Sequence, residues 1–554
     1  MQFAIPLETE VSNLALSPDG RMLAFVSRDD TSGENMLYFE RLGDPRATML
    51  PGSEGASYPF WSPDDAYIGF FANGKLKKGP VSGGNPQVVT AATFGRGGSW
   101  SSRGIIIYAP DAGGPLWRVN ADGTNPAPLT DKVFLNTENS HRWPVFLPDG
   151  EHFLFWSGTF GSVTTDQVSG IYVSDLAAKE KKEITRATSN GGYANGYLYY
   201  VDDRKSLIAV PFDLKSAKTR GESVVVSDHL TYQPSVFYGV FSVGGAGNVV
   251  YSTSSGATLS LLAFYDRAGK ELARFGGPEV MANPTLSPDG KRATMDSADL
   301  KSANVDVWIE DLDRNTGSRF TFDPAEEATG VWSRDGGSIA YRSIGPNSVT
   351  LELKNASGSQ PPRQIFQSNN ADDIMPNSWA LDGRSLLCTY QPFSGGSDLV
   401  ILDLATGKKT SFLATKANET NGQISNNGKW AAYASNESGD WEVYVTTFPG
   451  AQGKWQISRG GGTQPRWRGD DNEIYYLDPK GVLTAVPVSP EETFSAGAPE
   501  PLFPIRSRAP ISSTDLYSYD AAKDGKRFLV DRYVKPDHIQ PLTVVLNATT
   551  EARK

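Results

Sequence analysis

A single turn motif recurs along this chain and restricts the folds that the chain can adopt. Its clearest form is LSPDGRMLAFVS at residues 16–27, where an apolar strand end meets Ser-Pro-Asp-Gly and an alternating apolar strand follows. Pro18 presets φ for the first turn position, Asp19 can hydrogen-bond to its own backbone, and Gly20 can take the positive φ that closes the turn. The motif therefore predicts a β-hairpin.

The hairpin motif returns at a regular spacing. Clear copies follow at residues 61–72, 146–156, 286–296, 332–343, 379–390, 424–435 and 521–530, and weaker copies at residues 100–109, 193–201, 241–252 and 467–477. The spacing of roughly 40 to 55 residues is the period expected of four-stranded propeller blades. Trp61, Trp332, Trp379 and Trp467 recur at one repeat position, which places them in the core between blades.

The number of repeats predicts two domains. Six copies precede roughly residue 260 and six follow, and six blades close readily into a ring. We therefore expect an all-β protein of tandem six-bladed β-propellers, twelve four-stranded blades in total, with domains at residues 1–262 and 263–554. The last repeat ends after residues 541–548, so another segment must supply its missing strand, and both residues 3–8 and residues 270–275 qualify.

Charge and cysteine content exclude several classes of protein. Lys and Arg number 52 against 63 Asp and Glu, a net charge of −11, whereas nucleic-acid surfaces need clustered positive charge. We expect no nucleic acid as a partner. The single cysteine, Cys388, excludes a disulfide within the chain and is expected to be a buried, inert thiol.

No run of about 18 apolar residues and no signal-peptide pattern is found, so we expect no membrane span in this chain.

Taken together, the repeats resemble the WD-repeat-like propellers of the TolB type. More narrowly, the chain is similar to the extracytoplasmic propeller region that follows the kinase domain and membrane span in certain bacterial serine/threonine protein kinases. The resemblance covers essentially the whole chain. The segments that carry it are residues 54–65, 74–87, 95–100, 140–156, 319–336, 433–450 and 454–467.

The resemblance implies an extracytoplasmic binding or sensor module, periplasmic or at the cell surface. In such relatives a membrane-anchored kinase precedes the propellers. This chain has no glycine-rich loop followed by a strand lysine, no HRD and no DFG, so it has no phosphotransfer machinery of its own.

Three classes of function remain from the sequence. The first is a non-catalytic module that binds a protein, a peptide or a small molecule. The second is a propeller-type hydrolase or lyase, although the chain lacks a G-x-S-x-G nucleophile elbow and has only four histidines. The third is a structural, self-assembling surface scaffold. We expect the first and predict no catalytic residues and no required cofactor.

The candidate site in the first half is a basic and aromatic group. His141, Arg142 and Trp143 stand immediately before an inner strand, where side chains approach a propeller channel, and Arg96 takes a comparable place. A cation beside an aromatic ring can hold an anionic or peptide ligand. The alternative is that Trp143 packs between blades and Arg142 pairs with an acid of a neighbouring blade.

In the second half the comparable positions are mostly acidic or amide. They are Glu326, Glu327, Asp372, Asp373, Glu419 and Gln464. Carboxylates that converge on one axis repel one another unless a cation or a basic partner lies among them. This pattern predicts a site for a divalent cation such as calcium, or for a basic segment of a partner. The alternatives are a solvated polar funnel, or pairing of each acid with a basic residue of the next blade.

Overall fold

The computed structural model describes residues 2–7, 9–29, 34–44, 46–130, 140–158, 169–177, 180–233, 236–245, 247–254, 259–299, 304–345, 348–368, 372–392, 396–491, 493–507, 517–535 and 538–548. The chain divides into two compact units. Unit 1 comprises Met1–Phe160, Thr165–Ala257 and Pro536–Lys554, and unit 2 comprises Gly161–Thr164 and Thr258–Lys535. The boundary expected at residues 262 and 263 stays a prediction.

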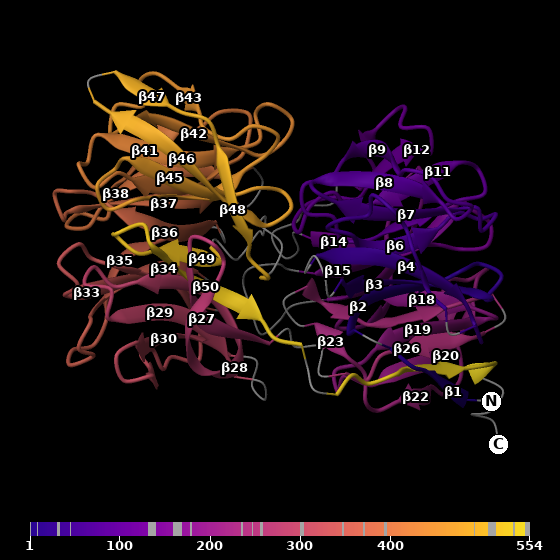
Figure 1. Ribbon diagram of the computed structural model, residues 1–554. Helices are drawn as coiled ribbons and strands as arrows, with labels where there is room; N and C mark the ends of the chain where they lie inside the picture. Colours follow the sequence, from indigo (N-terminus) through magenta and orange to yellow (C-terminus); the bar gives the residue numbers. More distant parts are fainter. Residues whose placement is uncertain are drawn as a thin grey trace. The chain divides into compact units, whose positions relative to one another are not determined.

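Unit 1 is built from antiparallel sheets of four or five strands (Figure 1). In order from the inner strand, its sheets are β2 (Val11–Leu16), β3 (Met22–Arg28), β4 (Asn35–Arg41) and β5 (Thr48–Met49); β6 (Ser57–Trp61), β7 (Tyr67–Ala72), β8 (Lys75–Pro80) and β9 (Gln87–Ala91); β10 (Gly98–Trp100), β11 (Ile105–Tyr108), β12 (Trp117–Asn120) and β13 (Ala127–Pro128); β14 (Ser140–Phe146), β15 (His152–Gly158), β16 (Gly170–Asp175) and β17 (Lys182–Arg186); β18 (Gly191–Ala194), β19 (Tyr197–Val201), β20 (Leu207–Asp213), β21 (Lys218–Thr219) and β22 (Val224–Ser227); and β25 (Phe241–Val243), β26 (Val249–Tyr251), β51 (Leu542–Val545) and β1 (Gln2–Ile5). A two-stranded ribbon, β23 (Tyr232–Gln233) and β24 (Tyr238–Gly239), accompanies them.

Unit 2 repeats this arrangement. Its sheets are β28 (Glu271–Leu286), β29 (Arg292–Ala298), β30 (Val305–Asp311) and β31 (Thr316–Arg319); β32 (Glu326–Trp332), β33 (Ser338–Ile344), β34 (Val349–Asn355) and β35 (Arg363–Gln367); β36 (Asp373–Trp379), β37 (Ser385–Gln391), β38 (Asp398–Asp403) and β39 (Lys409–Leu413); β40 (Glu419–Ile424), β41 (Trp430–Ser435), β42 (Glu442–Thr447) and β43 (Trp455–Gln456); β44 (Thr463–Trp467), β45 (Glu473–Leu477), β46 (Val482–Pro490), β47 (Phe494–Ala496) and β48 (Glu500–Pro504); and β49 (Tyr519–Ala521), β50 (Arg527–Tyr533), β27 (Ser260–Asp266) and the first half of β28.

The inner strands of each unit contact one another in cyclic order. In unit 1, β2 contacts β6, and the series continues through β10, β14 and β18 to β25, which contacts β2 again. In unit 2 the same series runs from β28 through β32, β36, β40 and β44 to β49, which returns to β28. The regular elements of the described residues are strands, and most lie in four-stranded sheets, so the prediction of an all-β fold is confirmed.

The two ends of the chain share one sheet of unit 1. Gln2 lies opposite Val545 in the antiparallel pair of β1 with β51, and β51 also pairs with β26. In Figure 1 the yellow C-terminal strand accordingly lies beside β1. The structure thus places residue 3 in the strand that completes this sheet, whereas residues 271–275 pair with β27 in unit 2. Both termini are therefore needed to complete unit 1.

Copies of the repeated turn that begin with serine and have aspartate two residues later share one set of hydrogen bonds. Ser17 Oγ and Ser333 Oγ each donate to an aspartate two residues later, at 2.6 Å, and accept from the backbone N–H of the next strand. Gly336 follows with φ 71°. Trp332 Nε1 donates across to the Thr285 carbonyl of the preceding sheet at 3.2 Å. The recurring tryptophan is thus fixed between sheets, as predicted.

Candidate functional site

A β-bulge in the inner strands determines which side chains reach each axis. Register shifts interrupt the pairing between Ser57 and Phe60 in β6 and between Ala328 and Val331 in β32. Within these bulges Tyr58 has φ 48° and Thr329 has φ 58°. A bulge re-aims its side chain relative to the regular pleat, so the bulge residue is the one that can face the axis.

In unit 1 the axis is filled by aromatic rings. Tyr58 and Trp143 lie 4.8 Å apart between ring centroids, and Tyr238 lies 4.8 Å from Trp143 and 5.5 Å from Tyr58. β6 and β14 belong to sheets that are not neighbours, because the sheet of β10 lies between them in the cyclic order. Rings from such strands can meet only near the centre. We call Tyr58, Trp143 and Tyr238 the aromatic axis.

Arg142 has no exposed surface, and its guanidinium lies over the rings of Trp156 and Phe237. Its Nε donates to the Ala112 carbonyl at 2.9 Å and to Ser140 Oγ at 2.7 Å, and its Nη1 donates to the Val236 carbonyl at 3.1 Å. Burial lowers the pKa of the guanidinium to about 9. The structure places this predicted ligand residue inside unit 1, where it binds backbone carbonyls.

His141 and Arg96, the other predicted basic residues, have separate partners. His141 is 1% exposed, its Nδ1 is 2.7 Å from Thr130 Oγ1, and burial lowers its pKa to about 4. The imidazole is therefore neutral at pH 7. Arg96 is half-buried, donates to the Phe94 and Gly95 carbonyls, and places its guanidinium 6.0 Å from the Tyr58 ring centroid.

In unit 2 the corresponding bulge residues are polar. They are Asn283, Thr329, Asn377, Asn421 and Gln464, and we call them the amide axis. Two of them accept hydrogen bonds from the residues before β49: Tyr517 N donates to Asn283 Oδ1 at 2.9 Å, and Ser518 N donates to Gln464 Oε1 at 2.8 Å. Gln464, a predicted site residue, is thus a structural bridge between β44 and the residues that precede β49.

Tyr517 occupies the centre of the amide axis. Its ring centroid is 3.5 Å from Cζ of Arg466, and Gln423 Nε2 donates to its hydroxyl at 2.8 Å. It also packs against Met375. Because these three contacts come from β44, β40 and β36, the tyrosine lies where the inner strands converge. It is 4% exposed, and burial raises its pKa to about 12.

The predicted acids, which we call the acidic rim, are Glu326, Glu327, Asp372, Asp373 and Glu419. Two of them converge on Arg342. Arg342 Nη1 lies 2.7 Å from Asp373 Oδ2, and Nη2 lies 3.2 Å from Glu326 Oε1. The arginine side chain is 2% exposed, whereas Asp373 is 25% and Glu326 45% exposed. Acids of two neighbouring sheets therefore share one buried guanidinium and keep part of their surface open.

The other acids of the rim have separate partners. Asp372 accepts from the Tyr390 hydroxyl, and Lys409 Nζ lies 3.0 Å from the centroid of the Tyr390 ring. Glu327 and Glu419 are buried and bind the loops before their own strands, Glu327 through Asp323 N at 3.1 Å and Glu419 through Thr415 Oγ1 at 2.6 Å. Burial raises the pKa of Glu327 to about 7 and raises that of Glu419 as well.

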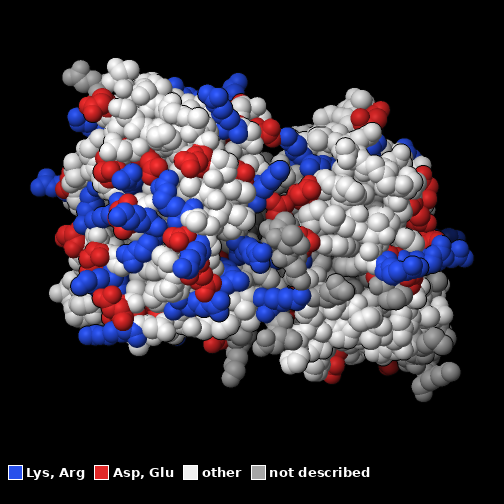
Figure 2. Space-filling model, viewed as in Figure 1, with Lys and Arg blue, Asp and Glu red and all other residues white. Residues whose placement is uncertain are grey.

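Among the described residues, no three or more His, Cys, Asp and Glu side chains form a group that could hold a metal ion. Within the same residues, no helix is long and apolar enough to cross a membrane. On the face shown in Figure 2, the described basic and acidic side chains of unit 2 are interspersed, without a large patch of one sign.

Sequence reasoning missed Arg342, Tyr517 and the bulge residues other than Trp143 and Gln464. A signal for the bulges is present, because Tyr58, Thr329 and Asn421 each stand four residues before a turn serine. Arg342 had no such signal, since it lies inside a strand and away from the turn motif. Tyr517 contacts the axis through residues far away in the sequence, which no local pattern encodes.

The comparisons with known proteins give only distant similarities. The chain matches no family model and no curated protein. Among solved structures it is similar to a putative TolB from Agrobacterium tumefaciens, at 16% identity and a TM-score of 0.42 over 50% of this chain and 100% of that one. Tricorn protease matches at 14% identity and a TM-score of 0.32 over 97% of this chain and 53% of that one. TolB from Acinetobacter baumannii matches at 14% identity and a TM-score of 0.33, over 54% and 81%.

Proposed function

We propose that this chain is a non-catalytic binding module made of two six-bladed propellers in tandem. The cyclic contacts of the inner strands in each unit support this architecture. The aromatic axis and Tyr517 are largely buried at the two centres, so binding is directed to the rims and loops. Rigid sheets that present loops and rims are a common basis for recognition. An extracytoplasmic setting, with a sensor role, rests on the resemblance of the repeats.

The acidic rim is the observation that supports a partner most directly. Arg342 fixes Glu326 and Asp373 in place from within, while both carboxylates keep exposed surface. Acids held in position lose little side-chain freedom on binding, which favours association. The negative charge of the whole chain, −11, adds long-range attraction for a basic partner. We therefore propose that the rim binds a basic segment of a protein or peptide.

A titration with a short polylysine peptide at low salt tests this proposal. The variant Asp372→Asn/Asp373→Asn should weaken binding about twofold to thirtyfold, because it removes two partly exposed ion pairs with the peptide, each of which contributes about 0.2–1 kcal/mol. Added salt should weaken binding to wild type, since exposed charges are screened.

The matched control is Glu491→Gln/Glu500→Gln, which removes two exposed acids of unit 2 outside the rim. This control should bind nearly as wild type does. Equal weakening in both double variants would mean that the peptide senses only net charge, which would overturn the rim as the site. Thermal melts of each variant show whether loss of Asp373 disturbs the fold around Arg342.

A further inference from the structure

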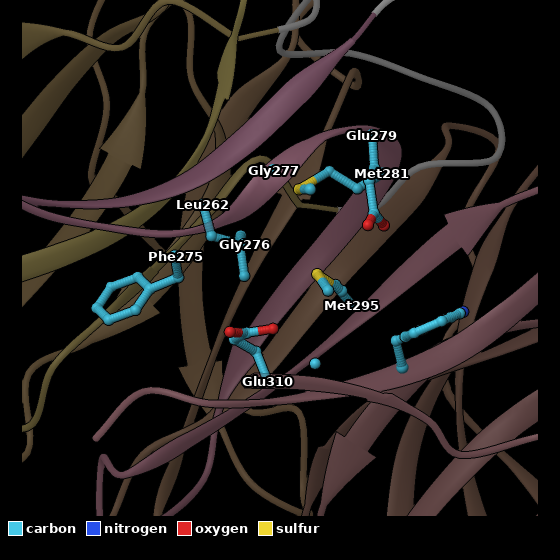
Figure 3. A pocket seen from close by; sticks show the side chains of 10 residues that line it. Leu262, Phe275, Gly276, Gly277, Glu279, Met281, Met295 and Glu310 are labelled. Atoms are coloured by element: carbon cyan, nitrogen blue, oxygen red, sulfur yellow. The ribbon is translucent and has the colours of Figure 1, made fainter. Parts of the chain in front are cut away.

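A cavity of about 140 Å³ lies inside unit 2 where β28 changes its partner (Figure 3). The first half of β28 pairs with β27, and its second half pairs with β29, so the strand passes from one sheet into the next. Residues of β27, β28, β29, β30 and β31 line the space. The cavity therefore lies between two successive sheets and is partly open to solvent.

Half of the residues that line this cavity have apolar side chains. Leu262, Phe275, Met281 and Met295 line it and are each less than a tenth exposed, and Trp308 joins them. An apolar cavity of about 150 Å³ can hold a benzene ring. The volume of the cavity therefore suits a small organic molecule. It is much larger than the volume that a bare metal ion bound to the sulfurs of Met281 and Met295 would fill.

Two carboxylates enter the same space. Glu310 is 2% exposed, and no described group donates a hydrogen bond to its Oε1. Glu279 Oε2 accepts from Ser297 Oγ at 2.9 Å. Both acids line the cavity, and its lining contains no Lys, Arg or His. Burial and the neighbouring Glu279 raise the pKa of Glu310. A buried carboxylate without a positive partner is costly, so the cavity is electrostatically complementary to a cation.

Glycines keep the approach to Glu310 open. Gly276, Gly277 and Gly317 line the cavity and are exposed at its outer side. A Cβ at position 317 would lie 2.7 Å from Glu310 Oε2. A side chain at this position would therefore press on the carboxylate, whereas glycine leaves room beside it.

We propose that this cavity binds a small organic ammonium ion. Its charged nitrogen would pair with Glu310 and Glu279, and its apolar part would pack against Met281 and Met295. Trp308 also lines the cavity, and an indole ring can attract a cation. Thioether side chains adapt readily to ligands of different shape, which suits a site for amines as a chemical class. This proposal is independent of the acidic rim.

Calorimetric titration of wild type with benzylamine and with benzyl alcohol tests the proposal without any substitution. The two probes have nearly the same shape, but only the amine is charged at pH 7. We expect a dissociation constant on the order of 1 mM for benzylamine and binding weaker by at least about tenfold for the alcohol. Equal binding of both probes would overturn the proposal. A parallel titration with silver(I), a cation that prefers sulfur ligands, tests the two methionines as a metal site. Heat from silver(I) together with no heat from benzylamine would also overturn the proposal.

Glu310→Gln identifies the site, because the amide keeps the shape of the side chain and removes its charge. We expect benzylamine to bind this variant at least about tenfold more weakly than wild type. Gly317→Ala should weaken binding as well, through pressure on Glu310. Glu500→Gln, which removes an exposed carboxylate away from the cavity, should leave binding unchanged. Unchanged binding to Glu310→Gln would place the amine elsewhere and refute the assignment.

Discussion

The two units place different chemistry at the same backbone position. In unit 1 the bulges carry Tyr58 and Trp143, which meet Tyr238 ring against ring. In unit 2 they carry amides such as Asn283 and Gln464, which bind backbone N–H groups near β49. The bulge is a property of the repeat, whereas the residue at the bulge decides whether buried rings or directional hydrogen bonds join the sheets.

The difference between the two axes predicts that substitutions at the bulges will affect the stability of the two units in different ways. An aromatic axis gains stability from buried area and ring contacts, which tolerate small shifts. An amide axis depends on hydrogen bonds whose loss leaves a buried group unpaired. Both axes carry one further cost, because Asn377 Nδ2 and Trp143 Nε1 are buried and no described group accepts from either.

The largest effect is expected from Trp143→Ala. Trp143 is 4% exposed and contacts two rings, so its removal should lower the free energy of unfolding of unit 1 by about 3–5 kcal/mol. Hydrogen exchange followed by mass spectrometry should show faster exchange in peptides of β6 and β14 and unchanged exchange in β40. Trp143→Phe, which keeps a ring, should cost less. Equal losses in both units would contradict separate axes.

The next effect is expected from two buried carboxyl groups, one in each unit. Burial is the main reason that the pKa values of Glu40 and Glu327 rise from 4.5 to about 7. The folded state thus holds each proton more tightly than the unfolded state does. Below pH 4.5 each group is protonated in both states, so it has no effect on the pH dependence of stability. As pH rises from 4.5 towards 7, the free energy of unfolding falls. Above pH 7 the decrease is complete and amounts to at most ~3 kcal/mol for each group.

Glu327→Gln should therefore remove the part of this pH dependence that belongs to unit 2, and Glu40→Gln the part that belongs to unit 1. Urea unfolding at pH 5 and pH 8, read by brief hydrogen-exchange labelling at one fixed pH, separates the two units. If wild type and Glu327→Gln lose the same stability in unit 2 between these pH values, Glu327 does not ionise in this window.

Gln464→Met tests the amide axis directly. Methionine keeps the length of the side chain but cannot accept the hydrogen bond from Ser518 N, so unit 2 should lose about 1–3 kcal/mol. Exchange should increase in peptides of β44 and β49. A methionine variant as stable as wild type would show that the bridge makes no net contribution, and the contrast with the aromatic axis would disappear.

Much of the fold could be predicted, because its signals are local. The turn motif gives hairpins, and Gly336 and Gly383 have the positive φ, 71° and 64°, that the motif predicts. The strand that completes unit 1 could not be chosen, since the pairing of Gln2 with Val545 joins opposite ends of the chain. Local patterning is equally compatible with either candidate strand.

The site was only partly predictable for the same reason. The sequence identified Glu326 and Asp373 as acids before neighbouring inner strands, and the structure brings them together. It did not identify Arg342 between them, nor Glu310, because each lies inside a strand and the sequence does not show which residues of other strands it will meet. Burial of Arg142 was also not predictable, since its acceptors are the backbone carbonyls of Ala112 and Val236.

The smallest effect concerns a feature that both units share, the turn glycine. Gly20 and Gly336 have φ of 72° and 71°, a conformation that costs an L-residue about 1 kcal/mol. A Cβ at Gly336 would meet nothing closer than Pro288 Cδ at 3.6 Å, whereas at Gly20 it would lie 3.2 Å from Asn248 Nδ2. Gly336→Ala should therefore show the backbone strain alone, and Gly20→Ala the same strain plus a steric contribution.

Gly337→Ala is the control in unit 2, because Gly337 has no positive φ. Thermal melts should rank Gly20→Ala below Gly336→Ala and Gly336→Ala below Gly337→Ala; a Gly337→Ala variant as unstable as Gly336→Ala would mean that side-chain bulk, and not backbone conformation, selects glycine in this turn.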